Sequence, residues 1–249
     1  MILTLIFTLL TTGSQLEPND SLKNQSLEVF SPNKIYEFQA SYINSKGDTL
    51  TKEWIELKPF GKPWKFQKTQ TAYIVYYHFT KADSLKFLSN LNPVSKNPKK
   101  PKPYFWSKTS GETGALENDT TLWMHPFREN QYVYTEIAPF PEIRKKLLKI
   151  DGEWKNGLGI YLGWGNFKGK VFSTYTVLKK ENRTYGNLYL KDCWLIHAVG
   201  KHNKLGKSYL DFYYHPEYGF VEMNYTFYDG VKINFVLKSV TVKNNEVAD

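Results

Sequence analysis

Residues 221–237 read VEMNYTFYDGVKINFVL. Apolar and polar side chains alternate on both sides of Asp229-Gly230, and a period of two is the pattern of a half-buried strand. An Asp-Gly pair between two such runs is typical of a tight hairpin turn. With the aromatic run that begins at Tyr209 as a third strand, we expect residues 209–240 to form a meander with one apolar face.

The same pattern recurs upstream. Residues 36–42 alternate, and residues 44–48 predict a turn into a second strand at residues 53–58. Residues 72–79 are nearly all aromatic or β-branched, as in a central strand, and residues 171–178 alternate again. The sequence therefore predicts a mainly β fold. We expect a large curved antiparallel sheet or incomplete barrel, with one or two short helices packed against it.

Two segments are candidates for those helices. Residues 82–91 carry leucines at helical spacing after a capping Thr80, and a second helix is expected from Pro141 to Lys149 because proline suits the first helical position. Residues 131–137 predict a further strand. The proline- and lysine-rich residues 92–104 lack apolar periodicity, which indicates an extended, exposed connector.

The first residues indicate export. Residues 2–10 are apolar and residues 11–14 are small, so we expect a signal peptide at residues 1–15, a flexible tether at 16–33 and a single β-rich domain at 34–249. Ser14 stands where a bacterial lipoprotein would carry cysteine, so lipid attachment is not predicted. Cys193 is the one cysteine, which excludes an internal disulfide and favours the bacterial periplasm or cell envelope.

Lysine and arginine exceed acidic residues by 33 to 24, a formal charge of +9. Part of this charge is concentrated at residues 96–102 and 144–149. A basic surface attracts nucleic acid, anionic lipid or acidic glycan, although clusters this loose are also ordinary solvated surface. We expect no nucleic acid, keep an anionic membrane surface as a candidate partner, and find nothing that sets the oligomeric state.

The stretch from Trp123 to Arg128 is the most specific local cluster. His125 and Arg128 could pair with a substrate carboxylate or phosphate, and Glu136 could orient the imidazole. The alternative interpretation is a proline-containing turn whose aromatic rings close one end of the core. Tryptophans near turns could instead form an exposed stacking platform. The candidate ligand-binding residues are Trp123, His125, Arg128, Tyr134, Glu136, Trp54, Trp64 and Trp106.

Common catalytic and metal motifs do not occur. The chain has no Gly-x-Ser-x-Gly, His-Glu-x-x-His or Cys-x-x-Cys pattern, so we predict no catalytic residue, metal ligand or cofactor. The glycine-rich residues 157–165 lack the Lys-Ser/Thr pair of a phosphate-binding loop and are interpreted as strand. Cys193, Leu195 and Val199 flank His197 on its strand face, so we interpret His197 and His202 as core or partly buried histidines rather than ligands.

Residues 213–220, YYHPEYGF, are followed by strand, Asp229-Gly230 and strand. This order resembles the closing meander of exported proteins related to the LolA and LolB lipoprotein carriers. The resemblance covers the C-terminal meander. It implies an antiparallel sheet curled into an incomplete barrel, helices that close its mouth, and a concave apolar face that receives acyl chains. It assigns no individual ligand residue.

Four functions follow from these features. The leading hypothesis is an exported, non-catalytic binding protein that holds a hydrophobic or amphipathic, lipid-like ligand against a curved sheet. It requires that the inward face is not filled by the protein's own side chains. The alternatives are a cell-envelope glycan-binding module with exposed aromatic rings, a structural or partner-binding module, and a hydrolase-type enzyme. The enzyme requires His125, Arg128 and Glu136 to meet in one cleft.

Overall fold

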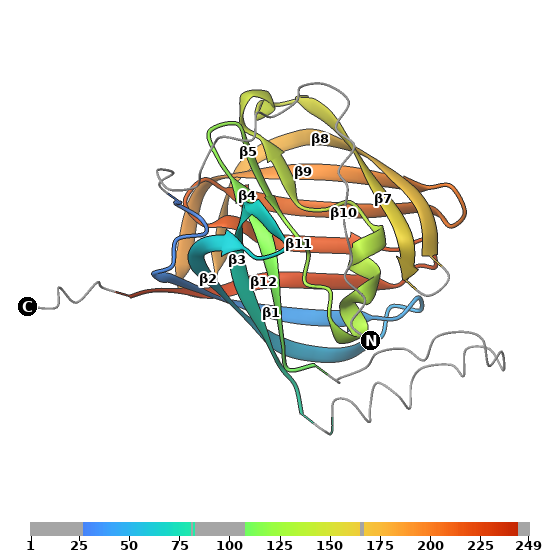
Figure 1. Ribbon diagram of the computed structural model, residues 1–249, viewed down its shortest axis with the longest axis horizontal. Helices are drawn as coiled ribbons and strands as arrows, with labels where there is room; N and C mark the ends of the chain where they lie inside the picture. The colour runs from blue at the N-terminus through green and yellow to red at the C-terminus, as the bar shows by residue number, and fades with distance from the viewer. Residues whose placement is uncertain (1–26, 81, 83–107, 165–166, 244–249) are drawn as a thin grey trace, which may run out of the picture.

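The computed structural model describes residues 27–80, 82, 108–164 and 167–243 of the 249. Within them, twelve antiparallel strands form one sheet that curls into a barrel-like shape (Figure 1). The strands and 3-10 helices are β1 (Lys34–Ile43), β2 (Thr49–Trp64), β3 (Gln67–His78), β4 (Ser110–Glu117), β5 (Thr121–Met124), η2 (Asn130–Ile137), β6 (Glu142–Arg144), η3 (Lys145–Leu147), β7 (Glu153–Trp164), β8 (Phe167–Tyr185), β9 (Leu188–His202), β10 (Gly206–His215), β11 (Gly219–Thr226) and β12 (Lys232–Val242). The mainly β, curved-sheet prediction is confirmed.

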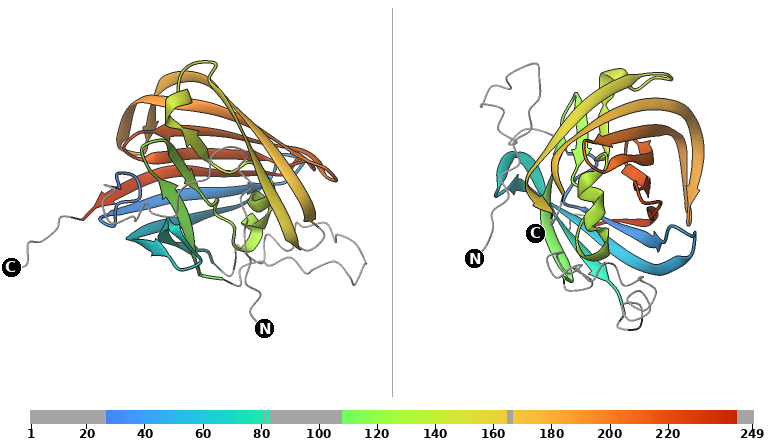
Figure 2. Two further views of the ribbon diagram at one scale, coloured as in Figure 1. Left: turned by 45° about the horizontal axis from the view of Figure 1, so that its top comes forward. Right: turned by 90° about the vertical axis from the view of Figure 1, so that its right-hand side faces the viewer.

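The strand order explains why the barrel is incomplete. It runs β6-β5-β4-β3-β2-β1-β12-β11-β10-β9-β8-β7, so two meanders are joined where β1 pairs with β12. The consecutive strands β6 and β7 lie at opposite ends of this order. The sheet therefore bends until its two edges approach each other, and the chain crosses between them at residues 145–152 (Figure 2). We call this junction the seam.

The C-terminal meander has the predicted register. Met223, Tyr225, Ile233 and Phe235 are at most 1% exposed, whereas the polar residues between them are half-buried. Gly230 has φ +83°, a left-handed conformation that glycine adopts without strain and that the tight turn requires. One face of these strands thus supplies the barrel's interior.

That interior is filled with aromatic rings. The ring centroid of Phe235 on β12 lies 4.9 Å from that of Phe127, 5.2 Å from that of Tyr132 and 6.1 Å from that of Tyr225. Two of these partners come from a segment that runs through the barrel rather than from its wall. The concave face is covered by the chain itself, mainly by η2 and the residues before it (Figure 2, right). The unfilled inward face that the binding hypothesis requires is therefore not present among the described residues.

The strand predicted at residues 131–137 is wrong. These residues form the 3-10 helix η2. Near its start the Tyr132 N–H donates to Glu129 O at 3.1 Å, and at its end the Ala138 N–H donates to Thr135 O at 3.2 Å. Inside a barrel no strand edge is available as a partner, so a buried backbone must satisfy its polar groups locally.

The helix predicted from Pro141 to Lys149 is also wrong. Glu142–Arg144 form β6, which pairs with β5 through Leu122 and Ile143, and a single 3-10 turn follows. The open edge of β5 offers ladder hydrogen bonds that a short helix would forgo. Helix propensity is a weak preference that such tertiary contacts override.

Other expectations fall on residues outside the described ones: the signal peptide, most of the helix at 82–91, and the connector at 92–104. Part of the expected tether is described. The amides of Val29 and Phe30 donate to the Glu117 carboxylate at 2.9 and 2.8 Å, and both side chains are buried. Residues 27–33 are thus packed against the sheet. Among the described residues, no helix has the length and apolarity to cross a membrane.

Candidate functional site

The candidate site is the interior of the barrel and the segment that occupies it. We call residues 125–137 the plug. It begins after β5, and Asn130 starts η2 with φ +57°, a conformation that asparagine tolerates better than most residues. The plug is unusually polar for buried chain: Asn130, Gln131, Thr135 and Glu136 are at most 3% exposed.

One end of the plug is held by an acidic residue of the barrel wall. Glu53 on β2 points inward and is 3% exposed. Its Oε2 accepts hydrogen bonds from the Tyr132 hydroxyl at 2.6 Å and from the Gln131 amide. Burial, followed by the Glu53 carboxylate, raises the pKa of Tyr132 well above its ordinary value, so the hydroxyl stays protonated and can donate.

The other polar contact of the plug is centred on Arg128. Its Nη1 donates to Glu136 Oε1 at 2.8 Å and lies 3.1 Å from His125 Nδ1, while Nη2 donates to Thr113 Oγ1 at 2.9 Å. Burial, helped by the nearby Arg128 charge, lowers the pKa of His125 well below its usual range. The imidazole is therefore neutral, and its Nδ1 accepts the hydrogen bond.

Glu136 is a buried carboxylate whose charged form is disfavoured by its surroundings. It is completely buried, and burial raises its pKa despite the opposing charge of Arg128. Burial by itself lowers the pKa of Arg128. The Glu136 carboxylate outweighs this effect, so the pKa of Arg128 is raised. The ion pair thus keeps the arginine charged, at the cost of a carboxylate in an apolar surrounding.

Three buried polar atoms at the contact between plug and barrel have no hydrogen-bond partner among the described residues: Gln131 Oε1, Glu136 Oε2 and the Tyr225 hydroxyl. Each such atom costs about 1–3 kcal/mol relative to its solvated state. Five buried atoms of the barrel wall are unpaired among the described residues in the same way: Thr51 Oγ1, Trp64 Nε1, Gln70 Oε1, Trp154 Nε1 and His202 Nε2. The plug covers an apolar face with polar groups that are only partly paired.

A small hollow lies at the seam. Asn156 on β7 donates to Glu142 on β6, and this side-chain bond links the two sheet edges. Beside it is a cavity of about 20 Å³, room for roughly one water molecule. The residues that line it are mostly apolar: Trp123, Ala138, Phe140, Asn156, Gly157, Leu158, Ser173 and Tyr175.

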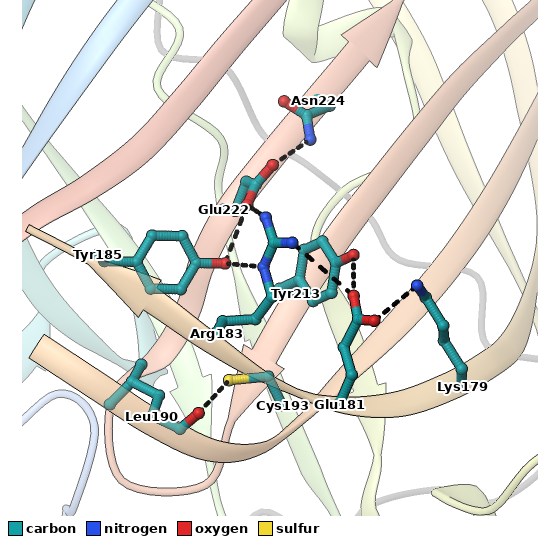
Figure 3. Close-up of polar contacts among 9 residues, drawn as sticks. All are labelled: Lys179, Glu181, Arg183, Tyr185, Leu190, Cys193, Tyr213, Glu222 and Asn224. Atoms are coloured by element: carbon teal, nitrogen blue, oxygen red, sulfur yellow. Dashed lines mark hydrogen bonds and ion pairs between the residues drawn. The ribbon is translucent and has the colours of Figure 1, made fainter.

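A second polar cluster lies outside the barrel (Figure 3). Arg183 near the end of β8 donates to Glu222 on β11 at 2.8 Å, and its guanidinium lies 4.3 Å from the ring centroid of Tyr213 on β10. The Tyr185 hydroxyl also donates to Glu222, at 2.9 Å. Because β9 separates β8 from β10 in the sheet, these contacts fasten the tip of the β8–β9 hairpin onto neighbouring strands. We call this cluster the clasp.

The structure brings several predicted site residues together. The His125 ring lies 4.7 Å from Trp123 and 5.6 Å from Trp64, and all three are buried. Arg128 joins His125 to Glu136 as the enzyme hypothesis requires, but they meet in the core and line neither the seam cavity nor a second hollow at residues 76–79 and 109.

The remaining candidates are dispersed. Trp54 is 49% exposed on β2, whereas Trp64 is buried, so these two do not form the flat row that a glycan platform needs. Tyr134 is half-buried and packs 6.0 Å from Phe227. Trp106 lies outside the described residues. No group of three or more His, Cys, Asp or Glu within the described ranges is arranged to hold a metal ion.

Sequence reasoning missed Glu53 and its two partners. A clue was present, because Glu53 shares an alternation phase with Ile55 and Leu57 and so occupies an inward position of a strand. A charged residue at such a position needs a buried partner. Gln131 and Tyr132 gave no comparable clue, because their placement depends on the plug's path.

No family model matches the chain, and no curated protein matches its sequence. Three solved structures are similar to this chain. A Bacteroides fragilis protein described as exported with a YmcC-like fold is 10% identical, over 85% of this chain and 96% of that one, with TM-score 0.47. A proposed Parabacteroides distasonis lipoprotein is 12% identical, over 87% and 100%, with TM-score 0.45. A proposed outer-membrane lipoprotein-sorting domain from Vibrio parahaemolyticus is 10% identical, over 86% and 87%, with TM-score 0.35.

These likenesses concern the course of the chain and extend to neither ligand nor activity.

Proposed function

We propose that the protein is an exported, non-catalytic binding protein, and that a hydrophobic or amphipathic, lipid-like ligand takes the place of the plug on the concave face of the barrel. One observation carries the proposal. The apolar interior is covered by a polar segment whose buried Gln131 Oε1 and Glu136 Oε2 have no partner among the described residues.

The exchange of plug for ligand has opposing contributions to the free energy. Withdrawal of the plug exposes the rings of Phe235 and Tyr225, which a ligand must cover again. An acyl chain contributes about 0.8 kcal/mol for each methylene it buries. Withdrawal also returns Glu136 and Arg128 to water, which relieves the cost of burying them.

The proposed cellular location follows from the sequence. The apolar run at residues 2–10 and the small residues after it support export to the periplasm or cell envelope. Lipids in that compartment carry acyl chains, which match the apolar wall, and many carry anionic headgroups, which match the formal charge of +9.

A variant that loosens the plug tests this function. Tyr132→Phe removes the hydroxyl that donates to Glu53 while the ring keeps its volume. We expect the withdrawn state to gain about 1–2 kcal/mol relative to wild type. Because the apparent dissociation constant scales inversely with the competent fraction, titration with dansyl-undecanoic acid should give about tenfold tighter binding in the variant.

Tyr189→Phe is the matched control, because Tyr189 is 57% exposed on β9 and lies outside the plug contact. It should bind the probe as wild type does. If wild type and Tyr132→Phe both fail to bind the probe, or if Tyr132→Phe loses stability and binds no more tightly, the interior is a permanent core and the proposal fails.

A further inference from the structure

The hairpin between β2 and β3 ends in an unusual surface. Residues 60–68 read FGKPWKFQK, with three lysines and no acidic residue. We call this segment the basic tip; it is drawn in cyan in Figure 1. Lys62, Lys65 and Lys68 are exposed, and none of them forms an ion pair with a described residue. The tip thus concentrates positive charge that the fold itself does not use.

Aromatic rings lie beside two of these lysines, with Phe66 exposed and Phe60 half-buried. Phe66 is 58% exposed, among the highest values for a large apolar residue of the described chain. The Lys65 ammonium lies 4.9 Å from the centre of the Phe66 ring, and Lys62 lies 4.8 Å from the centre of the Phe60 ring. Such pairs place an apolar ring and a cation at the same depth on the surface.

Phe66 packs edge-on against Trp64, with ring centroids 5.3 Å apart, yet its side chain stays largely exposed. Trp64 pairs with Gln67, so Lys65 and Phe66 are the two turn residues, where Asn-Gly is the usual choice. Neither has a positive φ. By contrast, Trp64 is 7% exposed and packs 5.6 Å from His125, which fixes the base of the tip to the barrel. A rigid base therefore presents a bulky apolar residue outward.

We infer that the basic tip is a docking surface for an anionic lipid bilayer. Phe66 and Phe60 enter the boundary between headgroups and acyl chains, and the three lysines contact the lipid phosphates. Charge complementarity selects this partner: each lysine near an anionic membrane surface strengthens binding about fivefold, and apolar rings add burial that a purely electrostatic partner would not reward. Docking by the tip does not depend on the ligand proposed for the barrel interior.

Vesicle co-sedimentation of the full chain tests the inference. The probes are phosphatidylcholine vesicles with and without about one third phosphatidylglycerol. We expect binding to the anionic vesicles that weakens as salt rises, and little binding to the neutral ones. Replacing Lys62, Lys65 and Lys68 with Gln should lower the partition coefficient on the order of a hundredfold. Phe66→Ala should lower it on the order of fivefold.

Two matched controls separate the tip from bulk properties of the surface. The first control replaces Lys145, Lys146 and Lys149 with Gln, which removes the same charge from η3 and the residues just after it. The second control is Phe172→Ala, which removes a ring that is 59% exposed on β8. Both controls should keep anionic-vesicle binding within about twofold of wild type, once the removed charge is screened at physiological salt.

Three results would overturn the inference. One is an equal loss of binding in the η3 variant, which would assign the membrane contact to that surface. Another is equal binding to neutral and anionic vesicles. The third is absence of vesicle binding together with tip-dependent binding of a single-stranded oligonucleotide, which would identify the tip as a nucleic-acid surface.

Discussion

His125 is a buried imidazole held neutral between aromatic rings and the Arg128 guanidinium. Its pKa in the folded protein is well below the value of about 6.5 that it has when unfolded. Above that unfolded value neither state is protonated, and this stabilising contribution is complete. As the pH falls below it, the unfolded state takes up a proton that the folded state refuses, so stability is lost.

We therefore expect the free energy of unfolding to fall between about pH 6.5 and pH 5, with His125 contributing up to about 1.4 kcal/mol per pH unit. Urea unfolding of wild type and His125→Gln at several pH values measures this contribution. Glutamine can still accept from Arg128, and the variant should show a shallower slope. Some slope will remain, because burial also lowers the pKa of His202 and His215. Equal slopes would mean that His125 is protonated inside the folded protein.

At the scale of a structural element, the clasp holds the β8–β9 hairpin against the neighbouring strands. Arg183 connects the β8–β9 hairpin to Glu222 on β11, and the same hairpin contains the buried Cys193 (Figure 3). Burial raises the pKa of the Cys193 thiol to about 11, so the thiol reacts slowly while the hairpin stays fastened. The cysteine is thus a built-in reporter of hairpin opening.

Arg183→Met should destabilise the hairpin by about 1–2 kcal/mol, because it leaves the half-buried Glu222 carboxylate short of a charged donor. The rate of Cys193 modification by an aromatic disulfide reagent should rise roughly tenfold if the hairpin opens locally. Lys179→Met is the matched control, since its ion pair with Glu181 is on the exposed side of the clasp. If Cys193 is modified at the wild-type rate in both variants, the clasp does not hold the hairpin closed.

Elements differ in how far the sequence predicts them. The meander of β10, β11 and β12 was predictable because alternation and the Asp229-Gly230 turn are local properties of the chain. Residues 131–137 were not, because Tyr132, Tyr134 and Glu136 alternate like a strand while their surroundings leave no strand edge to pair with. β6 was missed for the converse reason: the free edge of β5 that recruits it is a property of the folded sheet.

At the scale of the whole molecule, the candidate site was half predictable. His125, Arg128 and Glu136 were grouped by type and spacing, and in the structure Arg128 contacts both of the other two. Their burial was not predictable, because it results from a barrel that closes around them. The inward position of Glu53 follows from strand alternation, but its partners become apparent only once the plug's path through the barrel is known.

We propose that the plug and a lipid-like ligand compete for one apolar face. Hydrogen–deuterium exchange of the amides of residues 129–138, with and without dansyl-undecanoic acid, detects this competition at the plug itself. We predict that ligand accelerates exchange throughout these residues while β10, β11 and β12 keep their protection. Bound ligand with unchanged or slower exchange in residues 129–138 would contradict the claim, because the plug would then remain in the barrel.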